Sequence, residues 1–212
     1  LGVITEVTAK ILKKPQVVKA ALIGFPTIEE GANATSEIIS NGIIPAGMEI
    51  MDKALIEATD NFSKAGYPRD AELLLIVEVD GTESEVDVLL KDVSSICTKN
   101  NCSSLKLSQS EKERLSFWSG RKSAFPACGA MAPDYYCMDG VIPRGKLAEA
   151  LLEIKRLSEK YNLPVANCFH AGDGNLHPLI MYNGADKEQF RKTEEFGAEI
   201  LKACVRLGGV IT

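Results

Sequence analysis

The sequence is poor in the residues and patterns that mark specialised classes of protein. Aromatic residues make up only 6% of the 212 residues, and there are two histidines and one tryptophan. No apolar run approaches the roughly 18–20 residues that a membrane span needs, so we expect no direct membrane insertion. Lys and Arg are interleaved with acidic residues at a net charge of −5, so no basic stripe predicts a nucleic-acid partner. Residues 1–6 have no basic flank before an apolar stretch, which argues against a secretion signal and favours a cytoplasmic location.

None of the six cysteines forms a C-x-x-C pair, which argues against a structural zinc knot. A disulfide framework is typical of short secreted chains, and this chain is long and rich in core residues. We therefore predict reduced thiols that pack mostly as small apolar groups.

Segments with the patterns of strands and helices alternate along the chain. Hydrophobic residues make up 45% and charged residues 25%, the balance of a globular protein with a full core. Pairs of Thr or Ser with a Glu three residues later predict helix starts at Thr27, Thr82 and Ser108. Runs of β-branched and apolar residues predict strands at 4–12, 17–25, 48–51, 71–79, 104–107, 135–142, 165–170 and 176–182. Helical periodicity predicts further helices at 53–62, 144–161 and 186–207.

This order of elements predicts an α+β fold. Two successive strand-helix-strand passages fit a ferredoxin-like β-α-β-β-α-β unit, and a further set of elements follows it. We expect ferredoxin-like units that form a broad, mostly antiparallel sheet with helices packed on one face.

The most informative segment is 167–178, which reads Asn-Cys-Phe-His-Ala-Gly-Asp-Gly-Asn-Leu-His-Pro. Its His170 and His177 are the only histidines, and they lie on either side of a Gly-Asp-Gly-Asn turn between two predicted strands. Reversal of the chain there would bring both imidazoles to one side, where they could share a substrate or a divalent metal such as zinc. Two ligands hold a metal weakly, so a third would have to come from elsewhere. On spacing alone, a hairpin whose histidines only satisfy local hydrogen bonds is an equally good interpretation.

The sequence His-Ala-Gly-Asp-Gly-Asn-Leu-His-Pro in this segment resembles the C-terminal domain of FAD-linked oxidases, the family that includes the flavin-bearing subunit of glycolate oxidase and D-lactate dehydrogenases. Residues 1–6 resemble the last strand of that family's FAD-binding domain. Residues 118–127 resemble its W-x-x-R helix, and residues 133–144 resemble the segment before its next helix. The resemblance covers essentially the whole chain, in order.

The resemblance implies a substrate-binding domain that helps oxidise a 2-hydroxy acid to a 2-oxo acid by hydride transfer to FAD. It implies catalytic roles for His170, His177 and Arg121. The two histidines would bind a divalent metal such as zinc that acts as a Lewis acid. Arg121 would bind the substrate carboxylate with its planar donor set, although by itself Arg121 reads as an exposed residue of an amphipathic helix. Asn175 would join Arg121 in substrate binding.

The resemblance also implies a division of the chain. Residues 1–14 would be the tail of the FAD-binding domain, where Gly2, Val3 and Thr5 approach FAD through their backbone. Residues 15–212 would be the substrate-binding cap, ending just before a family G-E-H-G segment whose Glu is a third metal ligand. The missing initial Met agrees with an excised fragment. We therefore expect the chain alone to bind neither FAD nor metal tightly and to be inactive, and its partners to be its own FAD-binding domain and other oxidase subunits.

Two other functions fit parts of the sequence. The chain could be a ferredoxin-like protein-interaction module with no catalytic role, in which the turn between the histidines is only structural. A free-standing zinc hydrolase is less well supported, because it needs three protein ligands and the chain has no further histidine. The position of Arg121 discriminates: beside both histidines it supports the enzyme, and in bulk solvent on the far side it supports the module.

Overall fold

A computed structural model describes residues 2–211. Leu1, the first residue of the predicted segment 1–14, and Thr212, the last residue of the predicted segment 15–212, lie outside the described residues. The first half is a ferredoxin-like unit with strands in the order β4-β1-β3-β2. Its elements are β1 (Val17–Phe25), α1 (Ile28–Ser40), β2 (Gly47–Asp52), β3 (Leu73–Gly81), α3 (Glu83–Lys99) and β4 (Ser104–Leu107). One additional helix, α2 (Lys53–Ser63), lies between β2 and β3.

The second half repeats this arrangement with strands in the order β7-β8-β6-β9, and β5 pairs with the far end of β8. Its elements are β5 (Asp134–Cys137), β6 (Gly140–Val141), the 3₁₀ helix η1 (Arg144–Lys146), α6 (Leu147–Tyr161), β7 (Val165–His170), β8 (Asn175–Tyr182), α7 (Lys187–Arg206) and β9 (Val210–Ile211). Two helices connect the halves, α4 (Glu111–Lys122) and α5 (Ala124–Gly129).

Strands β2 and β7 join the two units into one sheet. The second strand of each unit lies at its edge, and the two edges pair antiparallel with Glu49 opposite His170 and Met51 opposite Cys168. Every strand pair that the structure describes is antiparallel. The predicted α+β class, the ferredoxin-like units and the broad antiparallel sheet are confirmed.

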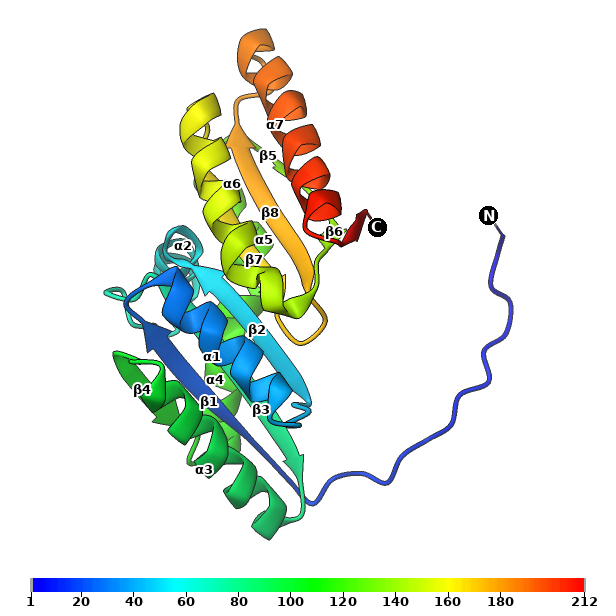
Figure 1. Cartoon of the computed structure of the whole chain (residues 1–212), viewed down its shortest axis with the longest axis vertical. Helices are drawn as coiled ribbons and strands as arrows, with labels where there is room; N and C mark the ends of the chain where they lie inside the picture. The colour runs from blue at the N-terminus through cyan, green and yellow to red at the C-terminus, as the bar shows by residue number, and fades with distance from the viewer. Residues whose placement is uncertain (1, 212) are drawn as a thin grey trace.

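The prediction that helices cover one face of the sheet is wrong. Helices α1, α3, α6 and α7 pack on one face, and α2, α4 and α5 pack on the other (Figure 1). The reason is visible in β1, where Ala21 and Ile23 pack in the first layer while Ala20 and Leu22 pack in the second. A strand that is apolar on both sides needs cover on both sides.

Several predicted boundaries also change. Thr82 starts α3 with a complete capping box and Thr27 caps α1, as predicted, but α4 is capped by Ser110 rather than Ser108. The predicted strand at 135–142 is two short strands, β5 and β6. The predicted strand at 4–12 forms no ladder in the structure.

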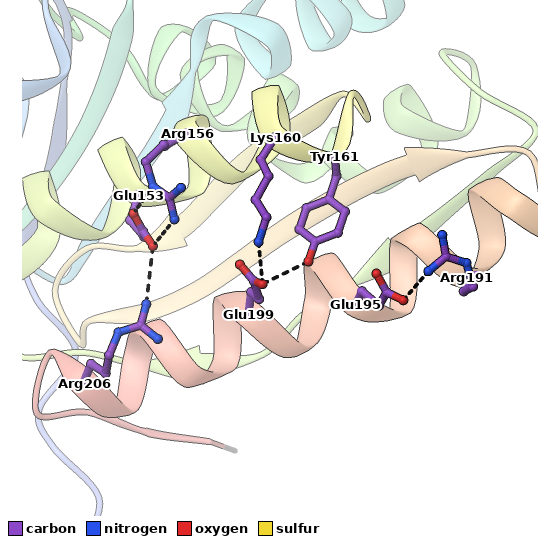
Figure 2. A network of polar contacts seen from close by, with 8 residues as sticks. All are labelled: Glu153, Arg156, Lys160, Tyr161, Arg191, Glu195, Glu199 and Arg206. Atoms are coloured by element: carbon purple, nitrogen blue, oxygen red, sulfur yellow. Dashed lines mark hydrogen bonds and ion pairs between the residues drawn. The ribbon is translucent and has the colours of Figure 1, made fainter.

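Helices α6 and α7 are linked by a network of charged side chains on the surface (Figure 2). Glu199 of α7 accepts hydrogen bonds from Lys160 at 2.6 Å and from Tyr161 at 3.0 Å. Exposed ion pairs of this kind contribute little to stability. Beneath them the ring of Tyr161 stacks on that of Phe196 at 5.5 Å, and this apolar contact does more to hold the helices together.

The six cysteines carry free thiols, as predicted, and four of them are buried. Among residues 2–211, no helix is both long enough and apolar enough to span a bilayer.

Candidate functional site

A tight turn connects β7 to β8 and sets the two histidines beside each other. The carbonyl of His170 accepts hydrogen bonds from the N–H groups of Asp173 and Gly174, both at 3.0 Å. Gly174 has φ of +80°, and a Cβ there would lie 2.3 Å from the carbonyl oxygen of Ile142. Only glycine suits a position that combines a left-handed conformation with such a close approach.

The imidazoles of His170 and His177 lie next to each other on the face covered by α4. Their ring centroids are 5.1 Å apart and the rings are nearly perpendicular. The side chain of His177 is 15% exposed and that of His170 is 40% exposed. The pair is therefore accessible from one side and supported by the sheet on the other.

Glu49 of β2 connects this pair to Arg121. Its Oε1 lies 2.6 Å from Nδ1 of His170, and its Oε2 accepts a hydrogen bond of 2.9 Å from Nε of Arg121. A carboxylate only accepts hydrogen bonds, so it favours the His170 tautomer with the proton on Nδ1. That tautomer leaves Nε2 available for a metal or a substrate.

Arg121 lies at the C-terminal end of α4 and points at this cluster rather than into solvent. Its side chain is only 12% exposed, so Arg121 is not the exposed residue of an amphipathic helix that the sequence alone would suggest. Glu49 engages Nε, and among the described residues the two Nη groups have no hydrogen-bond partner. The end of the guanidinium is therefore free to accept a carboxylate in the two-pronged geometry that Arg favours.

The environment of His177 favours a neutral imidazole. Burial lowers the pKa of His177; Asp139, whose Oδ2 lies 3.9 Å from Nδ1, opposes this, while His170 and Arg121 add to it. A neutral imidazole is the form that ligates metals.

Asn175 begins β8 directly opposite His170. Its Oδ1 is buried and has no hydrogen-bond partner among residues 2–211. Since a buried carbonyl without a partner is costly, this atom fits a position that a bound ligand or ion would satisfy.

The structure does not bring Gly2, Val3 and Thr5 to this cluster. Residues 2–15 form no helix or strand, and the segment runs away from the body of the molecule (Figure 1). Val3 is 88% exposed, and nothing lies within 4 Å of a Cβ built on Gly2. The role of these residues at FAD stays a prediction.

The donor set fits part of a divalent metal site. Zinc sites use imidazoles as direct ligands and carboxylates that contact the other ring nitrogen of those imidazoles. Here the two imidazoles are adjacent, and each has a carboxylate near its Nδ1. Within residues 2–211, no three His, Cys, Asp or Glu side chains are grouped so that they could hold a metal. The described residues therefore give no support to a self-contained zinc hydrolase.

Sequence reasoning missed Glu49 and Asp139. Glu49 lies 121 residues from His170 in the chain, and the pairing of β2 with β7 alone brings them together. The available signal was an acidic residue within the otherwise apolar run Met48-Glu49-Ile50-Met51.

Known proteins are similar to this chain over almost its whole length. Residues 14–212 match the family model described as FAD linked oxidases, C-terminal domain. The chain is 50% identical to the glycolate oxidase subunit GlcD of Escherichia coli K12, over all of this chain and 42% of that protein. It is 32% identical to GlcD of Bacillus subtilis, over all of this chain and 45% of that protein, and 31% identical to a mitochondrial D-lactate dehydrogenase (cytochrome) of Arabidopsis thaliana, over all of this chain and 37% of that protein.

Solved structures share the fold at low sequence identity. The 4-ethylphenol oxidase of Gulosibacter chungangensis superposes with a TM-score of 0.67 at 14% identity, over 94% of this chain and 46% of that one. A p-cresol methylhydroxylase also gives 0.67, at 16% identity over 94% of this chain and 45% of that one. The chain spans less than half the length of each of these proteins. From the match over residues 14–212 and the identity to these relatives, the chain belongs to the family of FAD linked oxidases, C-terminal domain.

Proposed function

We propose that the chain is the substrate-binding part of an FAD-dependent oxidoreductase that converts a 2-hydroxy acid to a 2-oxo acid. The relatives named for glycolate oxidase and D-lactate dehydrogenase support this reaction class. The observation that carries it is the convergence of Arg121, His170 and His177, which come from an α-helix and two strands, on one face of the sheet. An interaction module has no need for this convergence.

The substrate would bind through its carboxylate to the free end of Arg121. The guanidinium is little exposed, so water competes weakly for it, and Glu49 holds its other edge. The carboxylate of the acid would then place the C2 hydroxyl near the imidazoles. The Oδ1 of Asn175, which has no hydrogen-bond partner among residues 2–211, would accept a hydrogen bond from the hydroxyl of the bound acid.

Two groups from outside the described residues would complete the site. His170 and His177 would hold a divalent metal such as zinc, which when bound polarises the substrate oxygen. FAD, held mainly by the rest of the protein, supplies the hydride acceptor. This chain's own residues would bind the charged end of the acid at Arg121 and orient the acid toward the imidazoles.

The partners follow from this assignment. The chain's FAD-binding domain would cover the open face of the site, and other oxidase subunits would associate with the whole protein. A cytoplasmic location agrees with six free thiols.

The test uses the full-length protein reconstituted with FAD. Short 2-hydroxy acids, glycolate and D-lactate among them, are added without oxygen and flavin bleaching is followed. We expect bleaching by at least one acid in the full-length protein and none with residues 1–212 alone. Failure of every short 2-hydroxy acid to reduce the flavin would contradict the assignment.

Arg121→Lys tests the binding role in the same assay. Hydrogen bonds to a charged partner contribute about 1.5–3 kcal/mol, so loss of the two-pronged contact should lower kcat/KM roughly tenfold to a hundredfold. Arg114→Lys is the matched control, because Arg114 lies on the same helix, is similarly buried and pairs with Glu78. If both variants reduce kcat/KM equally, Arg121 has no special role in binding.

A further inference from the structure

The hydroxyl of Tyr67 lies against the backbone of α4 at the turn that carries Arg121. It donates a hydrogen bond to the carbonyl of Phe117 at 2.5 Å and accepts one from the N–H of Arg121 at 3.0 Å. These two backbone groups are the acceptor and donor of a single i→i−4 step of an α-helix. A side-chain group that enters such a step changes the local direction of the helix.

Gly120 leaves the space for this contact. A Cβ at position 120 would lie 2.3 Å from Cε2 of Tyr67 and 2.5 Å from its Cζ and Oη. The ring cannot move aside easily, because Tyr67 is only 4% exposed. Glycine is unfavourable inside a helix, so its presence here fits the close approach of the phenol.

Besides its contact with α4, Tyr67 is held through its backbone by Asp60 of α2. Asp60, which is 8% exposed, accepts hydrogen bonds from the N–H groups of Gly66 at 2.7 Å and Tyr67 at 3.1 Å, and it pairs with Arg69 at 2.7 Å. Burial raises the pKa of Tyr67 to about 12, so the hydroxyl keeps its proton and can donate it to a carbonyl. The phenol is therefore a fixed point against which α4 rests.

We propose that Tyr67 is a positioning residue for Arg121. Its hydroxyl holds the backbone of Arg121 so that Nε meets Glu49 and the Nη end faces the substrate carboxylate. This role rests on the proposed function of Arg121. Among residues 2–211 the hydrogen bonds of the Tyr67 hydroxyl go to the backbone of α4 and not to either histidine, so its effect on Arg121 would pass through the helix.

The first experiment needs no turnover and uses nuclear magnetic resonance on residues 1–212. Tyr67→Phe keeps the ring against Gly120 and removes only the oxygen. We expect the Nε–H and backbone amide signals of Arg121 to shift in Tyr67→Phe. The matched control is Tyr161→Phe, which removes a hydroxyl bonded to Glu199 on the distant α6–α7 pair (Figure 2) and should leave these signals unchanged.

The second experiment measures kinetics of the full-length protein with FAD. Loss of the hydroxyl should raise KM for the 2-hydroxy acid about three- to tenfold and change kcat by less than about twofold, because a carboxylate contact is present before and during the reaction. In an Arg121→Lys background, Tyr67→Phe should add no further rise in KM. Gly120→Ala, which displaces the phenol from the other side, should raise KM in the same way, and thermal unfolding checks that each variant folds.

Unchanged Arg121 signals in Tyr67→Phe would overturn the positioning role, and so would additive effects of the two substitutions on KM. If the Arg121 signals shift but the wild-type protein oxidises no 2-hydroxy acid, the positioning of Arg121 stands and the proposed function alone fails. The two failures are therefore distinguishable.

Discussion

Replacing Glu49 with Gln should change which nitrogen of His170 carries the proton. Both oxygens of Glu49 are engaged, Oε1 with Nδ1 of His170 and Oε2 with Nε of Arg121. Gln offers one oxygen and one NH₂. Because Arg121 has only donors, it should take the oxygen, and the NH₂ would then face Nδ1. Nδ1 must become the acceptor, and the proton moves to Nε2, the atom expected to bind a metal or substrate.

The size of the effect follows from the burial of the contact. The side chain of Glu49 is 13% exposed, so water competes little for it. A hydrogen bond to a charged group contributes about 1.5–3 kcal/mol, which favours the Nδ1–H tautomer roughly tenfold to a hundredfold in the wild type. Loss of an outer carboxylate of this kind typically lowers metal affinity by about 10–100-fold.

The assay is a long-range ¹H–¹⁵N correlation spectrum at a pH where both rings are neutral. The chain has only two histidines, so two imidazole patterns are expected and each reports its tautomer directly. Asp139→Asn is the matched control: its Oδ2 is 3.9 Å from Nδ1 of His177 and its side chain is 47% exposed, so this change should alter the His177 tautomer little. If His170 keeps the same tautomer in Glu49→Gln, the contact with Glu49 does not determine it.

Two stability predictions follow from other contacts. Gly174→Ala should lower the free energy of unfolding in urea by about 2–4 kcal/mol, because the new Cβ clashes with the backbone of Ile142 and the position is left-handed. The control is Gly66→Ala, where φ is +74° but no atom lies within 4 Å of the new Cβ, and it should lower that free energy by only about 1 kcal/mol. Equal decreases in the two variants would contradict the clash at position 174. Burial raises the pKa of Asp52 from 3.8 to about 6, and hydrogen bonds from Asn167 oppose this only in part. The folded state therefore binds the proton more tightly than the unfolded state, and the stability of the protein falls as pH rises from about 4 to 6. Asp52→Asn should remove that fall. Because Asp52 is only partly buried, we expect chemical unfolding to show the variant about 1–2 kcal/mol more stable than wild type at pH 7 and equally stable near pH 4. A difference in stability that does not change with pH would contradict the raised pKa of Asp52.

Much of the fold follows from patterns local in the chain. The Thr82 capping box, the apolar run of β3 and the Gly-Asp-Gly-Asn turn involve residues a few positions apart, so their geometry follows from backbone chemistry alone. For the same reason the sequence predicts the neighbouring imidazoles of His170 and His177, which a single turn sets side by side.

The sequence by itself determined most strands and helices, the hairpin and the ferredoxin-like order of the elements. Only the tertiary structure decided that two edge strands meet with Glu49 opposite His170, that a second layer of helices covers the other face, and that Tyr67 rests on Gly120 beside Arg121. An edge strand presents the same backbone donors and acceptors along its whole length, so its partner and register depend on the packing of both units and not on any local pattern.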